Sequence, residues 1–250
     1  MIVGIILAAG KGTRIKSKDR NKVTLPFLNK PMICYAVELL AGICDKVIVV
    51  VGAFHESVRQ VLKNYEVTYA FQKKRLGTGH AVKVAFHAIE NKHLSPAFVL
   101  IAYGDHAMFY QKQTVSDLMV KHKKEQSSVS FITTEYDKPD ELVWGRVIRD
   151  TKGNIVKIVE QKDASSEERN TKELNAGFYC IDYKFLKRSI RLLNKSSATG
   201  EYYLTDLIGM ALEQKKKVLG IKVPFEGVGI GINKYQELDE SQRMYLTKPR

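Results

Sequence analysis

An apolar segment, residues 2–7, runs directly into a loop of small residues and cations, and this junction constrains the fold more than any other part of the chain. The joined sequence from Leu7 to Arg14 reads LAAGKGTR. A continuous aliphatic run is typical of a parallel strand that is buried on both faces. The loop after such a strand lies at the carboxyl edge of the sheet, where α/β folds bind ligands. Gly10 and Gly12 would let backbone N–H groups approach a phosphate, and the lysine and arginine of the loop add positive charge.

Two common phosphate-binding loops do not match this stretch. A Walker A loop needs a glycine where this chain has Ile5, and a Ser or Thr after its lysine, where the chain has Gly12. A GxGxxG dinucleotide loop needs its third glycine where Ile15 stands. A glycine-rich turn that merely leaves a core strand is the alternative that this stretch alone leaves open.

Patterns typical of strands and helices alternate along the rest of the first half. The expected strands are 46–51, 67–70, 97–102 and 128–134. The expected helices begin at Pro31, near Glu56, at Thr78 (a candidate N-cap) and at Thr114. This alternation predicts an α/β fold, with a Rossmann-like, mostly parallel central sheet that helices cover on both faces.

The pattern changes after Asp137, where we expect a smaller mixed lobe that meets the first part across a cleft. Its expected strands are 146–149, 155–160, 175–181 and 218–223, and its expected helices are 183–193 and 205–214. A helix at 235–245 would close the chain. Because no linker separates the two parts, we expect one domain, 1–250, made of a nucleotide-binding part (1–137), a sugar-binding lobe (138–233) and a closing helix (234–247).

The charge and the cysteines narrow the classes of partner. A net charge of +13 suits nucleic acid, an anionic membrane surface or phosphorylated small molecules. The basic residues are scattered and match no common nucleic-acid-binding module, so we expect small substrates and no nucleic acid. No apolar run is long enough to span a membrane, and no basic residue precedes the first one as in a signal peptide. The three cysteines form no CxxC pair, which argues against zinc or a disulfide framework and fits a cytoplasmic protein.

An acidic residue follows the expected strand 97–102 directly, in the sequence Tyr103-Gly104-Asp105. A carboxylate at the end of a strand, beside a phosphate loop, is well placed to hold Mg²⁺. An aspartate in this position could also begin a turn or cap a helix. The neighbouring phosphate loop favours the metal.

Taken in order, these and later motifs resemble the sugar-1-phosphate nucleotidyltransferases. The motifs are LAAGKGTR, Gln72 with LGTGHA (76–81), YGD (103–105), WGRV (144–147), VEQKDA (159–164), NAG (175–177), EYYLTD (201–206) and the final Gly-Ile-Asn (231–233). They span nearly the whole chain and are most similar to the uridylyltransferase domain of the bifunctional N-acetylglucosamine-1-phosphate uridylyltransferase/glucosamine-1-phosphate acetyltransferase. The hexapeptide repeats of that family's acetyltransferase β-helix do not occur here, so we expect no acetyltransferase activity.

The resemblance implies a fold, a reaction and a role for each matching residue. The fold is that of the nucleotide-diphospho-sugar transferases, and the reaction joins UTP and N-acetylglucosamine 1-phosphate with Mg²⁺ as cofactor. The implied roles are catalysis (Arg14, Lys22, Asp105), nucleotide binding (Leu7, Ala8, Ala9, Gly10, Gly12, Gln72, Gly77, Thr78, Tyr103, Gly104), sugar binding (Gly145, Glu160, Asn175, Thr205) and metal binding (Asp105, Asn233).

The chemistry of this reaction agrees with the residues present. A sugar phosphate is already an anionic nucleophile at neutral pH, so the protein needs no Ser, Cys or His nucleophile. Its task is to align two anions and to neutralise charge on the leaving group. We therefore expect Asp206, or Thr205 beside it, to cap a helix rather than act as a base.

The chain also departs from the family pattern. Asn21 stands before Lys22 where a proline is usual, and the loop is one residue longer, so Lys18 or Arg20 could share the phosphate contact. The segment 106–108 (His-Ala-Met) replaces an apolar residue, Pro and Leu, and Trp144 replaces a Tyr.

Two alternatives stay open at this point. The same chemistry could use glucose 1-phosphate or another N-acetylhexosamine phosphate, or dTTP in place of UTP. A nucleotide-sugar-binding protein without turnover would keep the same fold. The sequence leaves the oligomeric state undetermined.

Overall fold

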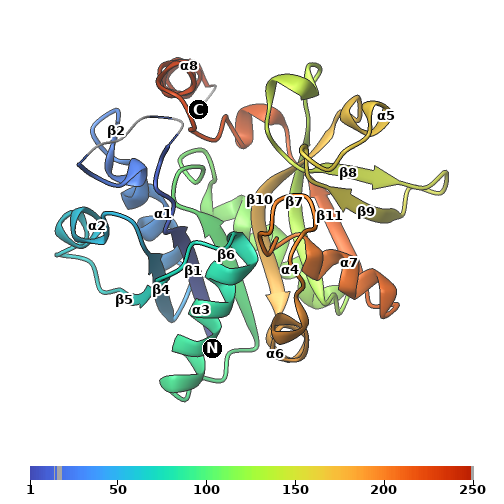
Figure 1. Ribbon diagram of the computed structural model, residues 1–250, viewed down its shortest axis with the longest axis horizontal. Coiled ribbons are helices and arrows are strands. Elements are labelled where there is room, and N and C mark those ends of the chain that lie inside the picture. The colour runs from blue at the N-terminus through green and yellow to red at the C-terminus, as the bar shows by residue number, and fades with distance from the viewer. Residues whose placement is uncertain (14, 16–18, 249–250) are drawn as a thin grey trace.

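The computed structural model describes residues 1–13, 15 and 19–248 and shows a mixed α/β fold around one central sheet (Figure 1). Strands follow one another across this sheet in the order β11-β7-β10-β6-β1-β4-β5. Their bounds are β1 (Ile2–Ala8), β4 (Lys46–Val51), β5 (Thr68–Phe71), β6 (Phe98–Tyr103), β7 (Val129–Glu135), β10 (Glu173–Asp182) and β11 (Val218–Lys222). A hairpin of β8 (Arg146–Arg149) and β9 (Ile155–Val159) pairs with the start of β10. The expectation of a mostly parallel α/β sheet is confirmed.

Helices cover both faces of the sheet. Successive side chains of a strand point to opposite faces, so the apolar strands need a helical layer on each side. Ile6 of β1 packs in one core with α1, α2 and α4, and Ile5 packs in another with α3, α6 and α7. The α-helices are α1 (Met32–Ala41), α2 (His55–Val61), α3 (Thr78–Asn91), α4 (Lys112–Lys124), α5 (Ser166–Arg169), α6 (Tyr183–Ser189), α7 (Asp206–Glu213) and α8 (Tyr235–Thr247). Short 3₁₀ helices are η1 (Lys22–Thr24), η2 (Pro139–Glu141), η3 (Ile190–Leu192) and η4 (Phe225–Gly227). In the part of the chain that the structure describes, no helix is both long and apolar enough to cross a membrane.

Strand β10 occupies a central place in the sheet, although it was expected in the smaller lobe. It runs antiparallel between β6 and β7, and β11 then continues the sheet parallel to β7. Residues after Asp137 therefore complete the main sheet, and β8, β9 and α5 project from its edge (Figure 1). The physical reason is that β10 is buried on both faces over 173–181, as only an inner strand can be. The division of the chain between nucleotide and sugar binding stays a prediction.

Parallel strands β1 and β6 end side by side, which brings two of the motifs together. Leu7 pairs in register with Tyr103, and the Gly104 N–H donates to the Leu7 carbonyl at 3.0 Å. The loop after β1 and the Tyr103-Gly104-Asp105 segment therefore share the carboxyl edge of the sheet. This is the edge at which open α/β sheets bind their ligands.

Helix α8 packs on a third, aromatic cluster beside that edge. A small hairpin of β2 (Pro26–Phe27) and β3 (Lys30–Pro31) supplies Phe27, whose ring meets those of Phe109 and Tyr245 edge to face. At the start of α8, the Glu237 carboxylate accepts the backbone N–H groups of Asn233 and Lys234. The closing helix thus fixes the two residues that precede it, Asn233 and Lys234.

Candidate functional site

A cavity of about 610 Å³ opens at the carboxyl edge of the sheet and is lined from both halves of the chain. Its size is in the range of small-molecule sites. Most of the predicted site residues line it: Leu7, Ala8, Ala9, Gly10, Gly12, Lys22, Gln72, Gly77, Thr78, Tyr103, Asp105, Gly145, Glu160, Asn175 and Asn233. Gly104 and Thr205 lie behind this lining and contact it through Leu7 and Glu160. Arg14 lies outside the described residues, as does Lys18, which was the alternative to Lys22 for the phosphate contact.

The loop after β1 is held by one buried amide side chain, that of Asn21. Its Nδ2 donates to the carbonyl oxygens of Ala8 (2.9 Å), Gly10 (3.1 Å) and Ala53 (2.8 Å). Its Oδ1 accepts the N–H of Val23 at 3.1 Å. Asn21 is 1% exposed, so this residue, which stands where the resemblance led us to expect a proline, fixes the loop after β1 by hydrogen bonds. The sequence showed the departure but not its role, because the partners are main-chain atoms.

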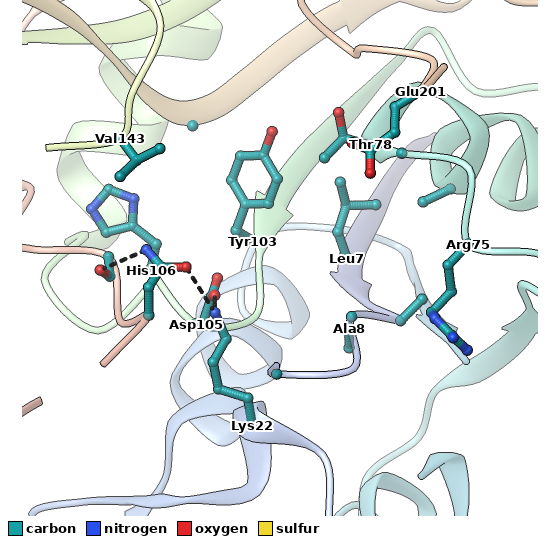
Figure 2. Close-up of a pocket in the computed structure, with 18 of the residues that line it drawn as sticks. Leu7, Ala8, Lys22, Arg75, Thr78, Tyr103, Asp105, His106, Val143 and Glu201 are labelled. Carbon is teal, nitrogen blue, oxygen red and sulfur yellow. Dashed lines mark hydrogen bonds and ion pairs between the residues drawn. The ribbon is translucent and has the colours of Figure 1, made fainter. Parts of the chain in front are cut away.

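A carboxylate, an amide oxygen and one cation meet at the floor of the cavity, where Figure 2 shows Lys22 beside Asp105. Lys22 Nζ forms an ion pair with Asp105 Oδ2 and donates to Asn233 Oδ1 at 3.3 Å. A carboxylate and an amide oxygen that face one positive charge form the kind of donor pair that Mg²⁺ prefers. These residues therefore fit a magnesium ion. Within the described residues, no cluster of three or more His, Cys, Asp or Glu side chains offers another metal site.

The expected nucleotide side of the cavity is built from β5 and the start of α3. Gln72 Nε2 donates to the Gly77 carbonyl at 3.2 Å and lies 2.9 Å from His80 Nδ1. Gly77 has φ +97°, and a Cβ there would lie 2.5 Å from the Tyr202 carbonyl oxygen, so only glycine fits. Thr78 was expected to cap α3, which is wrong. It is the first helical residue, and its Oγ1 accepts the backbone N–H of Leu204 at 3.0 Å.

The expected sugar side carries a carboxylate that is buried and hydrogen-bonded. Thr205 Oγ1 donates to Glu160 Oε1 at 2.7 Å. Burial raises the pKa of Glu160, and the Thr205 hydroxyl opposes that rise. Thr205 occupies the N-cap position of α7, as expected for Asp206 or Thr205, but its side chain makes no capping hydrogen bond, and Asp206 is already helical. Between β8 and β10, the Asn175 N–H donates to the Gly145 carbonyl at 2.8 Å, which fixes two predicted sugar-binding residues side by side.

Polar side chains lie between the two sides of the cavity. The Tyr103 hydroxyl interacts with the side chains of Thr78 and Tyr179. Asn175 Nδ2 in turn donates to the Tyr179 hydroxyl at 2.7 Å. In Figure 2, Tyr103 stands between Thr78 on one side and His106 on the other. Burial raises the pKa of Tyr103 well above its usual value, so the phenol stays protonated and acts as a donor.

A fully buried guanidinium supports the loop on the sugar side. Arg146 is 0% exposed, and it donates to the carbonyl oxygens of Pro139 (2.8 Å), Leu142 (3.1 Å) and Trp144 (2.5 Å). Burial lowers the pKa of Arg146, and Asp140 opposes that shift. The planar fork of an arginine can satisfy several carbonyls at once. Arg146 thereby sets the path of the chain into Gly145.

Several further residues line the cavity that were not given a specific role from the sequence. They include three cations, two aromatic or imidazole rings, and two residues of the EYYLTD motif: Lys11, Arg75, Lys162, His106, Trp144, Glu201 and Tyr203. Lys11, Trp144, Lys162 and the EYYLTD pair belong to motifs already recognised, so their place was within reach. Arg75 belongs to a short basic run that looks like a solvated surface in sequence. Arg20 instead pairs with Asp19 on the surface at 3.2 Å.

The amino-acid sequence is similar to a family of known proteins over nearly its whole length. A family model described as nucleotidyl transferase matches residues 3–227. The bifunctional protein GlmU of Acetivibrio thermocellus is 39% identical over 249 residues, which are 99% of this chain and 52% of that protein. GlmU of Desulfotalea psychrophila is 36% identical over 244 residues, or 96% of this chain and 70% of that protein. GlmU of Lactobacillus johnsonii is 40% identical over 230 residues, which are 92% of this chain and 48% of that protein. The chain thus spans about half the length of the first and third of these relatives.

A solved structure shares the fold at lower sequence identity. It is a crystal structure of a Bacillus anthracis protein named as a glucose-1-phosphate thymidylyltransferase, in complex with a sucrose. It superposes with a TM-score of 0.75 and 20% identity, and covers 100% of this chain and 97% of that one. At this identity the likeness shows the fold and says nothing of the substrate.

Proposed function

The chain belongs to the nucleotidyl transferase family, and from this premise we propose that it transfers the uridylyl group of UTP to N-acetylglucosamine 1-phosphate. One observation carries the proposal. A single cavity joins a small-residue loop beside Lys22 and Asp105 to a second wall that carries Glu160 and Asn175. The first wall suits a polyphosphate and its metal, and the second suits a sugar with hydroxyl groups. The ordered motifs and the similarity to GlmU proteins support uridine and N-acetylglucosamine as the specific pair.

In the proposed reaction, a phosphate oxygen of the sugar phosphate attacks the α-phosphorus of UTP. The bond from that phosphorus to the bridging oxygen of the β-phosphate breaks in line, and pyrophosphate leaves with both electrons. The attacking oxygen is already anionic, so no proton has to move. The protein's contribution is to bring two anions together and to offset the charge that grows on the leaving group.

The residues on the floor of the cavity would supply that charge. Lys22 would place its ammonium on the triphosphate, and Arg14 would assist it from the same loop. Asp105 and Asn233 would hold Mg²⁺, which supplies Lewis-acid stabilisation of the phosphate oxygens when bound. The backbone of the loop held by Asn21 would present N–H groups to the nucleotide.

The second wall would select and orient the sugar phosphate. Glu160, with its Oε1 held by Thr205, would accept hydrogen bonds from sugar hydroxyls on its other oxygen. Asn175 and Gly145 would contact the sugar from the neighbouring strands. Gln72 and the main chain at Gly77 and Thr78 would bind the nucleoside on the opposite side.

The test is pyrophosphate release in the presence of Mg²⁺. UTP, dTTP, CTP, ATP and GTP are each paired with N-acetylglucosamine 1-phosphate and with glucose 1-phosphate. We expect release with UTP and the N-acetylated sugar well above any other pair. Preferred release with another pair would overturn the substrate assignment but keep the reaction class. Tight UTP binding with no release from any pair would support a binding protein without turnover.

A further inference from the structure

One buried side chain at the cavity has no role in the proposed reaction, namely that of His106. It directly follows Asp105 and is 6% exposed. Filling this space alone would not require an imidazole, because an aliphatic side chain fills buried volume without the cost of desolvating two ring nitrogens. The contacts of the ring therefore need a separate account.

The first contact fixes the segment that leads to Asn233. His106 Nε2 lies 3.1 Å from the Gly229 carbonyl oxygen. A carbonyl can only accept, so Nε2 must carry the proton and donate it. Further along the same segment, a Cβ on Gly231 would lie 3.3 Å from His106 Cγ, so the backbone of Gly231 packs closely against the ring. The next N–H, that of Ile232, donates to the Asp105 carbonyl at 3.2 Å. The imidazole and the Asp105 main chain thus hold the 229–233 segment.

The second contact fixes the wall that carries Gly145. The centroids of the His106 and Trp144 rings lie 4.6 Å apart, with an angle of 51° between the ring planes. Trp144 is 9% exposed, and its own carbonyl is held by Arg146. His106 therefore forms the support against which the residue preceding Gly145 is packed. Both His106 and Val143, which lies one residue before Trp144, appear on the same side of the cavity in Figure 2.

We propose that His106 is a positioning residue that couples the metal-binding floor of the cavity to its sugar-binding wall. One ring edge sets Asn233 relative to Asp105, and one ring face sets the path of the chain at Trp144 and Gly145. His106 contacts no reacting atom and transfers no proton. This inference rests on the proposed function, since it takes the floor to hold the metal and the wall to hold the sugar.

Two substitutions separate the two contacts. His106→Phe keeps an aromatic ring for Trp144 but removes the donor to Gly229. His106→Gln places an N–H donor at a similar reach but removes the ring. Each change costs about one hydrogen bond or one aromatic contact, on the order of 1 kcal/mol, or about fivefold in a binding constant.

The measurements use Mn²⁺ as a probe of the metal and the emission of Trp144, the only tryptophan in the sequence, as a probe of the wall. We expect His106→Phe to raise the Kd of Mn²⁺ in the presence of UTP about fivefold and to leave the KM of the sugar phosphate within about twofold. We expect His106→Gln to do the reverse and to shift the Trp144 emission to the red without ligand. Thermal unfolding checks that each variant is folded. If either variant fails to fold, His106→Leu takes its place. Leucine lacks both the N–H donor and the aromatic ring, so it should raise both the Kd of Mn²⁺ and the KM of the sugar phosphate.

The coupling would be overturned if the Kd of Mn²⁺ and the KM of the sugar phosphate stayed within about twofold of the values for the unsubstituted protein in every folded variant. It would also be overturned if His106→Phe and His106→Gln each raised both constants by the same factor, because a merely structural role would weaken metal and sugar binding alike. Mn²⁺ binding and Trp144 emission do not depend on turnover. A protein that releases no pyrophosphate would thus refute the proposed function while these two readouts still test His106.

Discussion

Thr205 and Glu160, which lie far apart in the sequence, meet behind the cavity, where the threonine hydroxyl donates to Glu160 Oε1 at 2.7 Å. The bond occupies one carboxylate oxygen and leaves the other to accept from a ligand. It also orients a carboxylate whose ionised form is disfavoured by burial. A side chain that is costly to keep charged, and yet is held in place, is typical of a binding site.

Replacing this carboxylate by an amide should weaken sugar binding selectively. In Glu160→Gln a charged acceptor becomes a neutral one, and hydrogen bonds to charged groups contribute about 1.5–3 kcal/mol. We expect the KM for the sugar phosphate to rise about tenfold or more, with the KM for UTP within about twofold. Steady-state kinetics with each substrate varied in turn check this. Equal effects on both substrates would remove Glu160 from the sugar side.

The same substitution should stabilise the folded protein, although it weakens sugar binding. Because burial disfavours the ionised form of Glu160, the gain in stability should depend on pH. The pKa of Glu160 is raised above 4.5 in the folded protein, so the folded state holds the proton more tightly than the unfolded chain does. Ionisation therefore lowers stability as pH rises from 4.5 through the raised pKa, and below 4.5 the difference vanishes. We expect Glu160→Gln to raise Tm near pH 8, with a gain that shrinks as pH falls. Exposed Glu167→Gln is the matched control.

Removing the ammonium on the cavity floor should slow the chemical step. Lys22→Met keeps the aliphatic stem but loses the charge that would offset the leaving group. We expect kcat to fall about 10²–10³-fold, with the KM for the sugar phosphate within about threefold. Lys18→Met is the matched control on the same loop. A large loss of kcat in Lys18→Met with none in Lys22→Met would show that the family's lysine is aligned to the wrong residue.

Neutralising the proposed metal ligand should abolish metal-dependent turnover in a folded protein. In Asp105→Asn the carboxylate that faces Lys22 becomes a weaker ligand, and we expect activity to fall about 10³-fold and Mn²⁺ binding to be lost. Removing the metal from the unsubstituted protein with EDTA should have the same effect on turnover and be reversed by Mg²⁺. Circular dichroism and Mn²⁺ titration separate metal loss from unfolding. Asp163→Asn, outside the cavity lining, should behave as the unsubstituted protein; near-normal turnover in Asp105→Asn would exclude it as a ligand.

Removing the amide that holds the phosphate loop should affect stability and nucleotide binding together. Asn21→Ala deprives three carbonyls of a donor, one at the last residue of β1 and one in the loop that follows it. Each buried group left without a partner costs about 1–3 kcal/mol, less where water enters, so we expect a loss of about 2–4 kcal/mol in the free energy of unfolding. Urea denaturation measures it, with exposed Asn64→Ala as control. The KM for UTP should also rise, and an unchanged value would show that the loop keeps its shape without the clamp.

Sequence patterns could predict the elements and their class because burial on both faces and helical spacing are local properties. The strand at 2–7 and its phosphate loop follow from such patterns, as does Asp105 at the end of the strand beside it. The place of β10 does not, since a strand that is apolar on both sides carries no mark of its neighbours or its direction. Thr78 shows the same limit, because a threonine at a helix start looks alike whether its oxygen accepts from its own helix or from Leu204.

Contacts across the cavity could not be predicted from the sequence either, because local patterns do not identify distant neighbours. The His106–Trp144 ring contact and the three carbonyls on Arg146 depend on how distant segments pack. All three residues were visible in the chain, His106 and Trp144 as departures from the family pattern and Arg146 as a member of the WGRV motif. Their chemistry, an aromatic support and a carbonyl clamp, is defined only by atoms that come from elsewhere in the fold.

The late position of β10 in the chain has a consequence for how the protein is made. Strands β6 and β7 are synthesised well before their shared neighbour, which ends at Asp182. A nascent chain that has not yet reached this residue presents two open, apolar sheet edges, which are prone to pair with other chains. The long-range pairing also slows closure of the sheet. We therefore expect the growing polypeptide to need protection on the ribosome until β10 inserts, and fragments that end before Asp182 to aggregate rather than fold.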